Sequence, residues 1–375
     1  MKKELELYIH IPFCVRKCAY CDFLSGPSDD ATIQNYVEAL CKEVSVNAEF
    51  AKEYVVTTIF LGGGTPSILS GEQMTNIFDV VKNVFEVAKD AEITTEANPG
   101  TVSKEKLEAY KACGINRISF GLQSANNEDL KLLGRIHTYE EFLESYQLAR
   151  ESGFDNINVD LISAIPKQSL VMWEESLQKI IALNPEHISA YSLIIEEGTP
   201  FAKLYGEGSE GEKSLPSEEE EREIYKRTEE LLNAAGYHRY EISNYAKPER
   251  ECKHNLGYWE RKEYLGLGLG ASSLVDNRRF HNTENMRDYL QQSYDLQVIR
   301  LDEEILDETA QLEEYVFLGM RKMEGILLNE KLIQCYSDNI ERMKKQGLVE
   351  LQDGYLKLTK EGIDVSNYVF AEILF

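Results

Sequence analysis

Three cysteines lie close together near the amino terminus, with the spacing Cys-x₃-Cys-x₂-Cys at Cys14, Cys18 and Cys21. Cysteine thiolates are the ligands that hold iron-sulfur clusters, and a cubane of four irons offers four corners. Three cysteines would fill three corners and leave one iron open to a substrate or a cofactor. The spacing therefore predicts one four-iron four-sulfur cluster with an open coordination position.

Two other uses of these cysteines fit the sequence less well. A structural zinc site needs four ligands, yet Asp22 and Phe23 stand where a further Cys or His would be expected. Disulfides are disfavoured because seven cysteines is an odd number. The other four are scattered through predicted helices and loops, at Cys41, Cys113, Cys252 and Cys335. Reduced cysteines are typical of the cytoplasm, where we expect this protein to reside.

The cysteine motif, with an aromatic residue following it, resembles that of the radical S-adenosylmethionine (SAM) superfamily, whose open iron is chelated by SAM. The residues from Tyr8 to Cys14 read Tyr-Ile-His-Ile-Pro-Phe-Cys. They resemble the branch that contains oxygen-independent coproporphyrinogen III oxidase and the HemW-type haem chaperones. The resemblance runs through nearly the whole chain, and it implies a four-iron four-sulfur cluster and SAM as cofactors.

Six short apolar runs alternate with longer helical patterns and predict the elements that position the cysteines. Their strand-like residues are 5–11, 57–61, 93–96, 118–122, 157–162 and 188–195. Capping boxes at Thr138 to Glu141 and at Ser217 to Glu220 mark helix starts, and Gly114 and Gly153 mark helix ends. Six successive strand-helix units imply parallel pairing with right-handed crossovers. The fold class is therefore α/β, an open, partial TIM-type barrel of six βα units with its chemistry at the carboxyl ends of the strands.

Polar and glycine residues follow these strands at the predicted functional edge. The second strand ends in Gly62-Gly63-Gly64-Thr65-Pro66, and glycines let a backbone approach a ligand closely. The resemblance implies that Gly63, Gly64 and Thr65 contact the methionine part of SAM. It also implies that the rest of the cofactor is bound by Tyr8, Glu96, Gln123, Arg135 and Asp160. Each polar residue alone fits a cap, a turn or a salt bridge, but together they fall at one edge of the barrel.

A histidine further along the chain stands in the string His-Asn-x-x-Tyr-Trp, which begins at His254. A histidine beside Tyr and Trp is more often a packed residue with locally satisfied ring nitrogens. The string, however, resembles the motif that characterises HemW-type proteins, and imidazole is a common axial ligand of haem iron. His254 is therefore the candidate haem ligand, and Cys252 is a weaker candidate.

The choice between relatives rests on what the sequence lacks. Oxygen-independent coproporphyrinogen III oxidases generally carry a further cysteine two residues after the third, where this chain has Phe23. They also carry an arm ahead of the first strand, which here begins at about Leu5. We therefore favour a HemW-type haem chaperone over the oxidase, an analogy at the level of the family. A haem-degrading methyltransferase of the same superfamily has no motif in its support, and the family leaves open whether the protein is an enzyme.

Composition limits the partners. The chain has 375 residues, with 40 Lys and Arg against 65 Asp and Glu, for a formal charge of −25. Such a charge repels phosphate backbones and argues against nucleic acid as a partner. No stretch approaches the 18 or more apolar residues of a membrane span, although peripheral membrane association stays open. The expected partners are haem, haem-accepting apoproteins and, if SAM is cleaved, an electron donor.

The chain is long enough for more than one domain. We expect a radical SAM partial barrel over residues 1–240, a linking region with the histidine motif over 241–300, and a C-terminal domain over 301–375. Residues 206–215 predict a mobile loop over the barrel mouth. The glycine run from Gly266 to Gly270 lacks dinucleotide-binding spacing and predicts a close-packed strand or loop at the edge of the site. Helices over 303–322 and 329–345, followed by an Asp-Gly hairpin over 349–358, resemble a winged helix, and the acidic balance disfavours DNA binding.

Overall fold

The computed structural model describes residues 2–374. Met1 and Phe375, which the predicted first and last domains include, lie outside the described residues. One sheet forms the body of the molecule, with the strand order β12-β11-β10-β9-β1-β2-β3-β4-β5-β6-β8-β7. Its central six strands are parallel: β1 (Lys3–Ile11), β2 (Tyr54–Gly63), β3 (Glu86–Ala97), β4 (Arg117–Gln123), β5 (Ile157–Ser163) and β6 (His187–Ser192). This confirms the predicted open barrel of six βα units.

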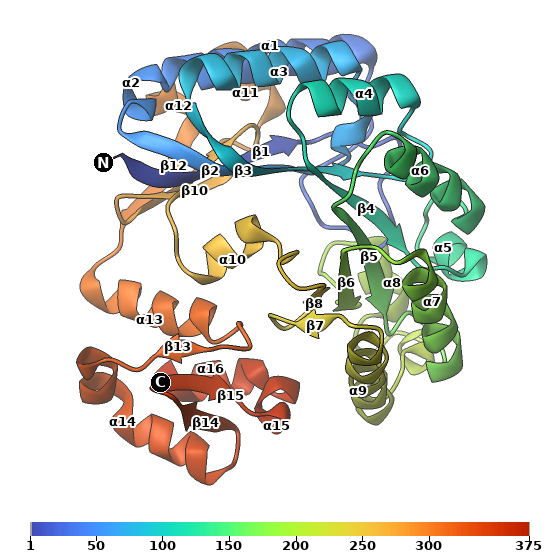
Figure 1. Cartoon of the computed structure of the whole chain (residues 1–375), viewed down its shortest axis with the longest axis vertical. Helices are drawn as coiled ribbons and strands as arrows, with labels where there is room; N and C mark the ends of the chain where they lie inside the picture. The colour runs from blue at the N-terminus through green and yellow to red at the C-terminus, as the bar shows by residue number, and fades with distance from the viewer. Residues whose placement is uncertain (1, 375) are drawn as a thin grey trace.

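Helices cover the outer face of the curved sheet (Figure 1). They include α1 (Asp30–Val46), α3 (Gly71–Val84), α4 (Lys104–Ala112), α5 (Asn127–Leu132), α6 (Tyr139–Glu151), α7 (Leu170–Leu183) and α9 (Glu218–Ala234). The capping boxes predicted at Thr138 and Ser217 are present at the starts of α6 and α9. Gly114 and Gly153 have positive φ angles of 87° and 82°, which a helix-ending glycine adopts at little steric cost.

The barrel does not close, because further strands, most of them antiparallel, extend both edges of the parallel sheet. β9 (Tyr264–Leu267), β10 (Ser272–Val275), β11 (Arg278–Asn282) and β12 (Arg300–Ile305) continue it beyond β1. Beyond β6 lie β8 (Asn244–Ala246) and β7 (His238–Arg239). The expected helix over residues 303–322 is wrong at its start, because residues 303–305 belong to β12, which pairs with β11. Gly266 and Leu267 end β9, and the rest of the glycine run forms the turn that follows it.

A small C-terminal domain follows, with its own buried apolar cluster. It contains α13 (Glu308–Gly319), α14 (Glu330–Lys345), α15 (Lys360–Asp364), α16 (Ser366–Leu374) and a sheet of β13 (Ile326–Leu327), β15 (Tyr355–Leu358) and β14 (Val349–Gln352). The predicted hairpin is β14 and β15, with positive φ angles at Asp353 and Gly354. The short helix α10 (Lys253–Trp259) lies between the main sheet and α13 (Figure 1).

The segment after β6 leads into the predicted mobile loop over residues 206–215. Helix α8 (Pro200–Tyr205) precedes the predicted loop, and the 3₁₀ helix η2 (Glu212–Ser214) falls within it. Phe201 of α8 is buried, and its amide donates a hydrogen bond of 3.0 Å to the carbonyl of Ala19 in the cysteine loop. Apolar contacts around Phe201, Leu133 and Ile165 form a separate small core beneath that loop. Helix α8 therefore packs against the cysteine loop.

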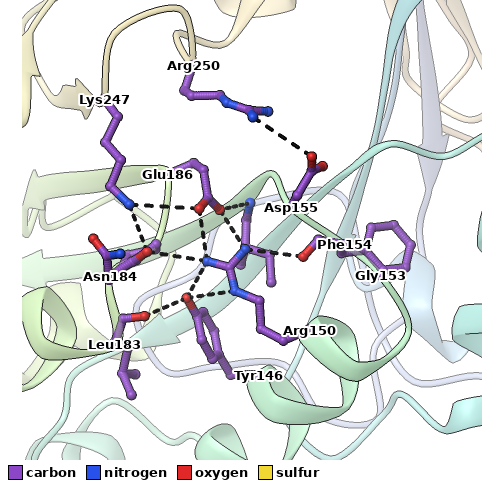
Figure 2. A network of polar contacts seen from close by, with 12 residues as sticks. Tyr146, Arg150, Gly153, Phe154, Asp155, Leu183, Asn184, Glu186, Lys247 and Arg250 are labelled. Atoms are coloured by element: carbon purple, nitrogen blue, oxygen red, sulfur yellow. Dashed lines mark hydrogen bonds and ion pairs between the residues drawn. The ribbon is translucent and has the colours of Figure 1, made fainter.

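At the amino-terminal ends of β5 and β6, a polar network joins the strands to the outer helices (Figure 2). Both oxygens of Glu186 accept hydrogen bonds from the Arg150 guanidinium of α6, at 2.8 and 3.2 Å. Glu186 also accepts from the amide of Ile157 at the start of β5, and Arg150 donates to the Tyr146 hydroxyl. Such a bidentate pair fixes the angle between α6 and the sheet.

Candidate cluster and cofactor site

A cavity of about 400 Å³ lies at the carboxyl ends of strands β2 to β6, next to the cysteine loop. Its walls combine residues from the cysteine loop and from the strand ends. The predicted site residues among them are Cys14, Cys18, Cys21, Gly63, Gly64, Thr65, Glu96, Gln123, Arg135 and Asp160. Of the residues predicted to hold the cluster or SAM, only Tyr8 is absent from the lining. The fold thus brings together residues that are as far as 146 positions apart, from Cys14 to Asp160.

All three cysteines carry free thiols that are only partly exposed. Thr65 donates a hydrogen bond to the Cys14 sulfur at 3.5 Å, and Arg135 donates one to the Cys18 sulfur at 3.4 Å. Hydrogen bonds of this kind orient the sulfur ligands of a metal centre. Within residues 2–374, no three His, Cys, Asp or Glu side chains converge as they would on a single metal ion. A cubane places each thiolate on a different iron, so its ligands do not need to converge on one point.

The glycine run after β2 passes through a space that side chains would fill. A Cβ atom on Gly63 would lie 2.4 Å from the His10 ring, and the φ angle of Gly63 is +109°. A Cβ atom on Gly64 would lie 2.5 Å from the carbonyl oxygen of Phe13. Only glycine fits both positions, so the backbone itself forms this wall of the cavity.

Two carboxyl groups lie at the cavity floor. Burial raises the pKa of Glu96 to about 8, and the nearby Asp160 carboxylate adds to the shift. Glu96 accepts a hydrogen bond of 3.1 Å from the Gly63 amide. Asp160 accepts hydrogen bonds from Asn158 and Ser119, and burial raises the pKa of Asp160 as well. Burial of two neighbouring carboxyl groups is costly without a cation, and a cationic ligand would relieve that cost.

Arg135 crosses the cavity wall beside the cysteines. Its guanidinium donates to the Asn98 side-chain oxygen and the Gly121 carbonyl, both at 2.6 Å. Asn98 in turn donates to the Thr65 hydroxyl at 2.8 Å. Sequence reasoning did not select Asn98, although its place directly after β3 was the available signal. Gln123 has a positive φ of 76° where the pairing of β4 with β5 shifts register, and strain of this kind often marks functional sites.

Tyr8 lies one residue layer behind the cavity. Its hydroxyl is 3.0 Å from the Nδ1 atom of His10, whose ring abuts Gly63. The Nε2 atom of His10 is 2.9 Å from the carbonyl oxygen of Leu24, at the end of the cysteine loop. His10 thus lies between the Tyr8 hydroxyl and Gly63.

His254 lies away from this cavity, on α10, and only 1% of its surface is exposed. Its Nδ1 atom is 2.7 Å from the Thr58 hydroxyl, and its Nε2 atom is 3.0 Å from the Tyr258 hydroxyl. Burial lowers the pKa of His254 to about 3, so the ring is neutral. Both ring nitrogens are therefore engaged in this conformation. Coordination of a haem iron by His254 would require one of these hydrogen bonds to be exchanged.

Cys252, the weaker candidate haem ligand, begins the same helix and is fully buried. Its thiol donates to Glu92 at 3.5 Å. Burial raises the pKa of Cys252 well above the usual thiol range, which disfavours the thiolate that would bind iron.

Comparison with known protein families assigns both parts of the chain. Residues 8–180 match the radical SAM superfamily, and residues 306–365 match the HemN C-terminal domain. Within residues 2–374, no helix is both long enough and apolar enough to cross a bilayer.

Individual relatives match over most of their length. The heme chaperone HemW of Lactococcus lactis subsp. lactis is 35% identical, over 100% of this chain and 98% of that protein. The heme chaperone HemW of Escherichia coli is 44% identical over 77% of this chain and 76% of that protein. Among solved structures, Escherichia coli coproporphyrinogen III oxidase (HemN) has a TM-score of 0.86 and 23% identity, covering 99% of this chain and 90% of that one. That likeness shows the fold.

Proposed function

Because this chain belongs to the HemW family of the radical SAM superfamily, we propose that it is a haem chaperone that delivers haem to apoproteins. In this proposal it holds one four-iron four-sulfur cluster, SAM and haem. The observation that carries the cofactor part is the single cavity shared by the three cysteines and the strand-end residues. The haem part rests on the names of the relatives and on the His254 motif.

The residues present fit a cluster at the cysteine loop. Cys14, Cys18 and Cys21 offer three soft sulfur ligands, and each of them lines the cavity. When bound there, the cluster would supply an open iron position facing the strand ends. Thr65 and Arg135, which donate to two of the sulfurs, would lower the electron density on those ligands.

In this proposal SAM occupies the remainder of the cavity, where a carboxyl group and a guanidinium group would receive its charged groups. Its ammonium group would be received by Glu96, and its carboxylate by Arg135 through charge-assisted hydrogen bonds. Gly63, Gly64 and Thr65 would flank its methionine part, and Gln123 and Asp160 would contact the rest. Tyr8 would act through His10, which packs against Gly63.

We propose that haem binds at α10. His254 would coordinate the iron through Nε2 after the Tyr258 hydroxyl moves away, because that contact lies within the same short helix. Tyr258 and Trp259 would then cover the apolar face of the porphyrin. A carrier must release its cargo unchanged, so haem binding should need no turnover of the cluster or of SAM.

The test is anaerobic reconstitution of the cluster followed by two separate titrations. Haem is titrated into the parent, His254→Ala and the control His238→Ala, with the Soret band and transfer to an apoprotein as readouts. Coproporphyrinogen III is incubated separately with SAM and a reductant. Saturable haem binding and transfer without decarboxylation would support the chaperone. Conversion of propionate groups to vinyl groups would instead support the oxidase.

Unchanged haem binding in His254→Ala would leave the chaperone proposal in place and assign His254 a packing role. A parent that binds no haem would contradict the chaperone proposal.

The seven thiols are free of disulfides, which supports a reducing compartment such as the cytoplasm as the proposed location.

A further inference from the structure

A continuous chain of hydrogen bonds joins the cavity carboxylate Asp160 to the first residues of α10. Asp160 accepts from the Asn158 amide nitrogen at 2.8 Å and from the Ser119 hydroxyl at 3.0 Å. The Asn158 oxygen is 2.6 Å from the Nδ1 atom of His187. The Nε2 atom of His187 is 2.8 Å from the Tyr240 hydroxyl, which also accepts from the Cys252 amide at 3.3 Å.

The chemistry of these groups allows one direction of donation along the chain. The Asn158 oxygen carries no hydrogen, so the Nδ1 atom of His187 must donate to it. His187 is fully buried, and burial beside the Arg117 cation holds its pKa well below the usual range. The ring is therefore neutral, and Nε2 accepts from Tyr240. Every donor between Cys252 and Asp160 consequently points toward the cavity.

The far end of the chain secures the start of α10. Glu92 of β3 accepts hydrogen bonds from the amides of Lys253 and His254, both at 3.2 Å. It also accepts from the Cys252 thiol at 3.5 Å. The Cys252 amide donates to the Tyr240 hydroxyl rather than to Glu92. Glu92 and Tyr240 together therefore bind the first three backbone amides around the start of α10.

We propose that His187 and Tyr240 are positioning residues that couple occupancy of the cavity to the release of α10. This inference rests on the proposed function. A SAM hydroxyl group that donates to Asp160 would compete with Asn158 for the same carboxylate oxygen. When the Asn158 contact weakens, His187 is held less firmly, because its two ring nitrogens bond only Asn158 and Tyr240 in this series of hydrogen bonds. Tyr240 then holds the Cys252 amide less firmly, and His254 becomes available to haem.

The chain offers a matched pair of variants for the test. Tyr240→Phe removes one hydroxyl from the middle of the chain and keeps the ring. Tyr245→Phe is the control, because Tyr245 is buried on the neighbouring strand β8 and its hydroxyl has no hydrogen-bond partner among the described residues. Both variants lose one buried oxygen, but only Tyr240→Phe interrupts the chain.

The experiment measures the haem dissociation constant of cluster-reconstituted protein with and without saturating SAM, in the absence of a reductant. We expect SAM to tighten haem binding about fivefold or more in the parent and in Tyr245→Phe, within the usual range of coupling between sites. In Tyr240→Phe the ratio should fall to about one, with haem binding already tight without SAM. Haem must tighten SAM binding by the same factor, because coupling is reciprocal.

A second measurement does not need haem at all. Hydrogen exchange at the amides of Cys252, Lys253 and His254 should accelerate when SAM binds the parent, and should be insensitive to SAM in Tyr240→Phe. Equal coupling ratios in the parent and in Tyr240→Phe would overturn the inference, as would SAM binding that leaves these amides unchanged. Failure of the parent to bind haem or SAM at all would instead contradict the proposed function.

Discussion

The buried carboxyl groups at the two ends of the parallel sheet have different partners. At the amino-terminal ends of β5 and β6, the carboxylate of Glu186 is matched by Arg150 and by the Ile157 amide (Figure 2). At the carboxyl ends, Glu96 and Asp160 line one cavity, where burial and then the Asp160 carboxylate raise the pKa of Glu96. Glu186 has a direct guanidinium partner, whereas the hydrogen bond that Glu96 accepts within the described residues comes from a backbone amide.

This contrast separates stability from function in one fold. Residues at the amino-terminal face of such barrels mainly stabilise the fold, whereas the carboxyl-terminal face carries the chemistry. The cavity end also contains the positive φ of Gln123 and the crowded Gly63. We therefore expect substitutions at the two ends to affect different measurements.

The largest effect is expected at the cysteines. Cys14→Ala, Cys18→Ala or Cys21→Ala should each abolish most reconstituted iron and its charge-transfer absorption, because all three ligands hold one cluster. Cys113→Ala is the control, since Cys113 is buried beside Thr75 and away from the cavity. Equal loss of iron from the control would contradict the assignment.

The next effect concerns SAM at the cavity end. Glu96→Ala and Arg135→Ala should each weaken SAM binding by roughly 1.5 to 3 kcal/mol, on the order of tenfold or more, by removing a charge-assisted hydrogen bond. Calorimetry on cluster-loaded protein measures it. Glu186→Gln, at the opposite end, should leave SAM affinity unchanged. Parent-like affinity in both cavity variants would refute this placement of SAM.

At the amino-terminal end the expected loss is in stability. Arg150→Met removes the guanidinium from Glu186 and Tyr146, and should lower the free energy of unfolding by about 1 to 3 kcal/mol. Denaturant unfolding of Arg150→Met measures this loss. A change in SAM affinity without a change in stability would break the proposed division between the two ends.

The smallest effect is a dependence of SAM affinity on pH. Because the pKa of Glu96 is raised to about 8, this carboxyl is mostly protonated at pH 6.5 and mostly ionised at pH 8.5. The ionised form attracts the SAM ammonium, so affinity should rise severalfold between these values. The rise should disappear in Glu96→Gln. In the SAM-free protein the same shift has the opposite sign for folding: stability is lost as pH rises toward 8, because the folded state holds the proton more tightly.

Much of the site was predictable because its signals are local. The three cysteines fall within eight residues, and the glycine run follows its strand directly. Strand-end positions could be inferred from periodicity, since parallel strands present their carboxyl ends at one edge. The start of β12 was missed because residues 303–305 are helix-compatible and belong to a strand only because β12 pairs with β11. Asn98 was missed because its two partners, Thr65 and Arg135, are each more than 30 positions away.

The sequence by itself determined the cluster motif, the six parallel strands and the edge at which the chemistry lies. Tertiary structure alone decided how His254 is held, because Thr58 is 196 positions away from it. It also decided the chain from Asp160 through His187 to Tyr240, whose members come from separate elements. Short-range sequence patterns indicate which face of a helix or strand a residue occupies. The partner of a buried polar group is set by which distant strands become neighbours, and periodicity carries no information about that.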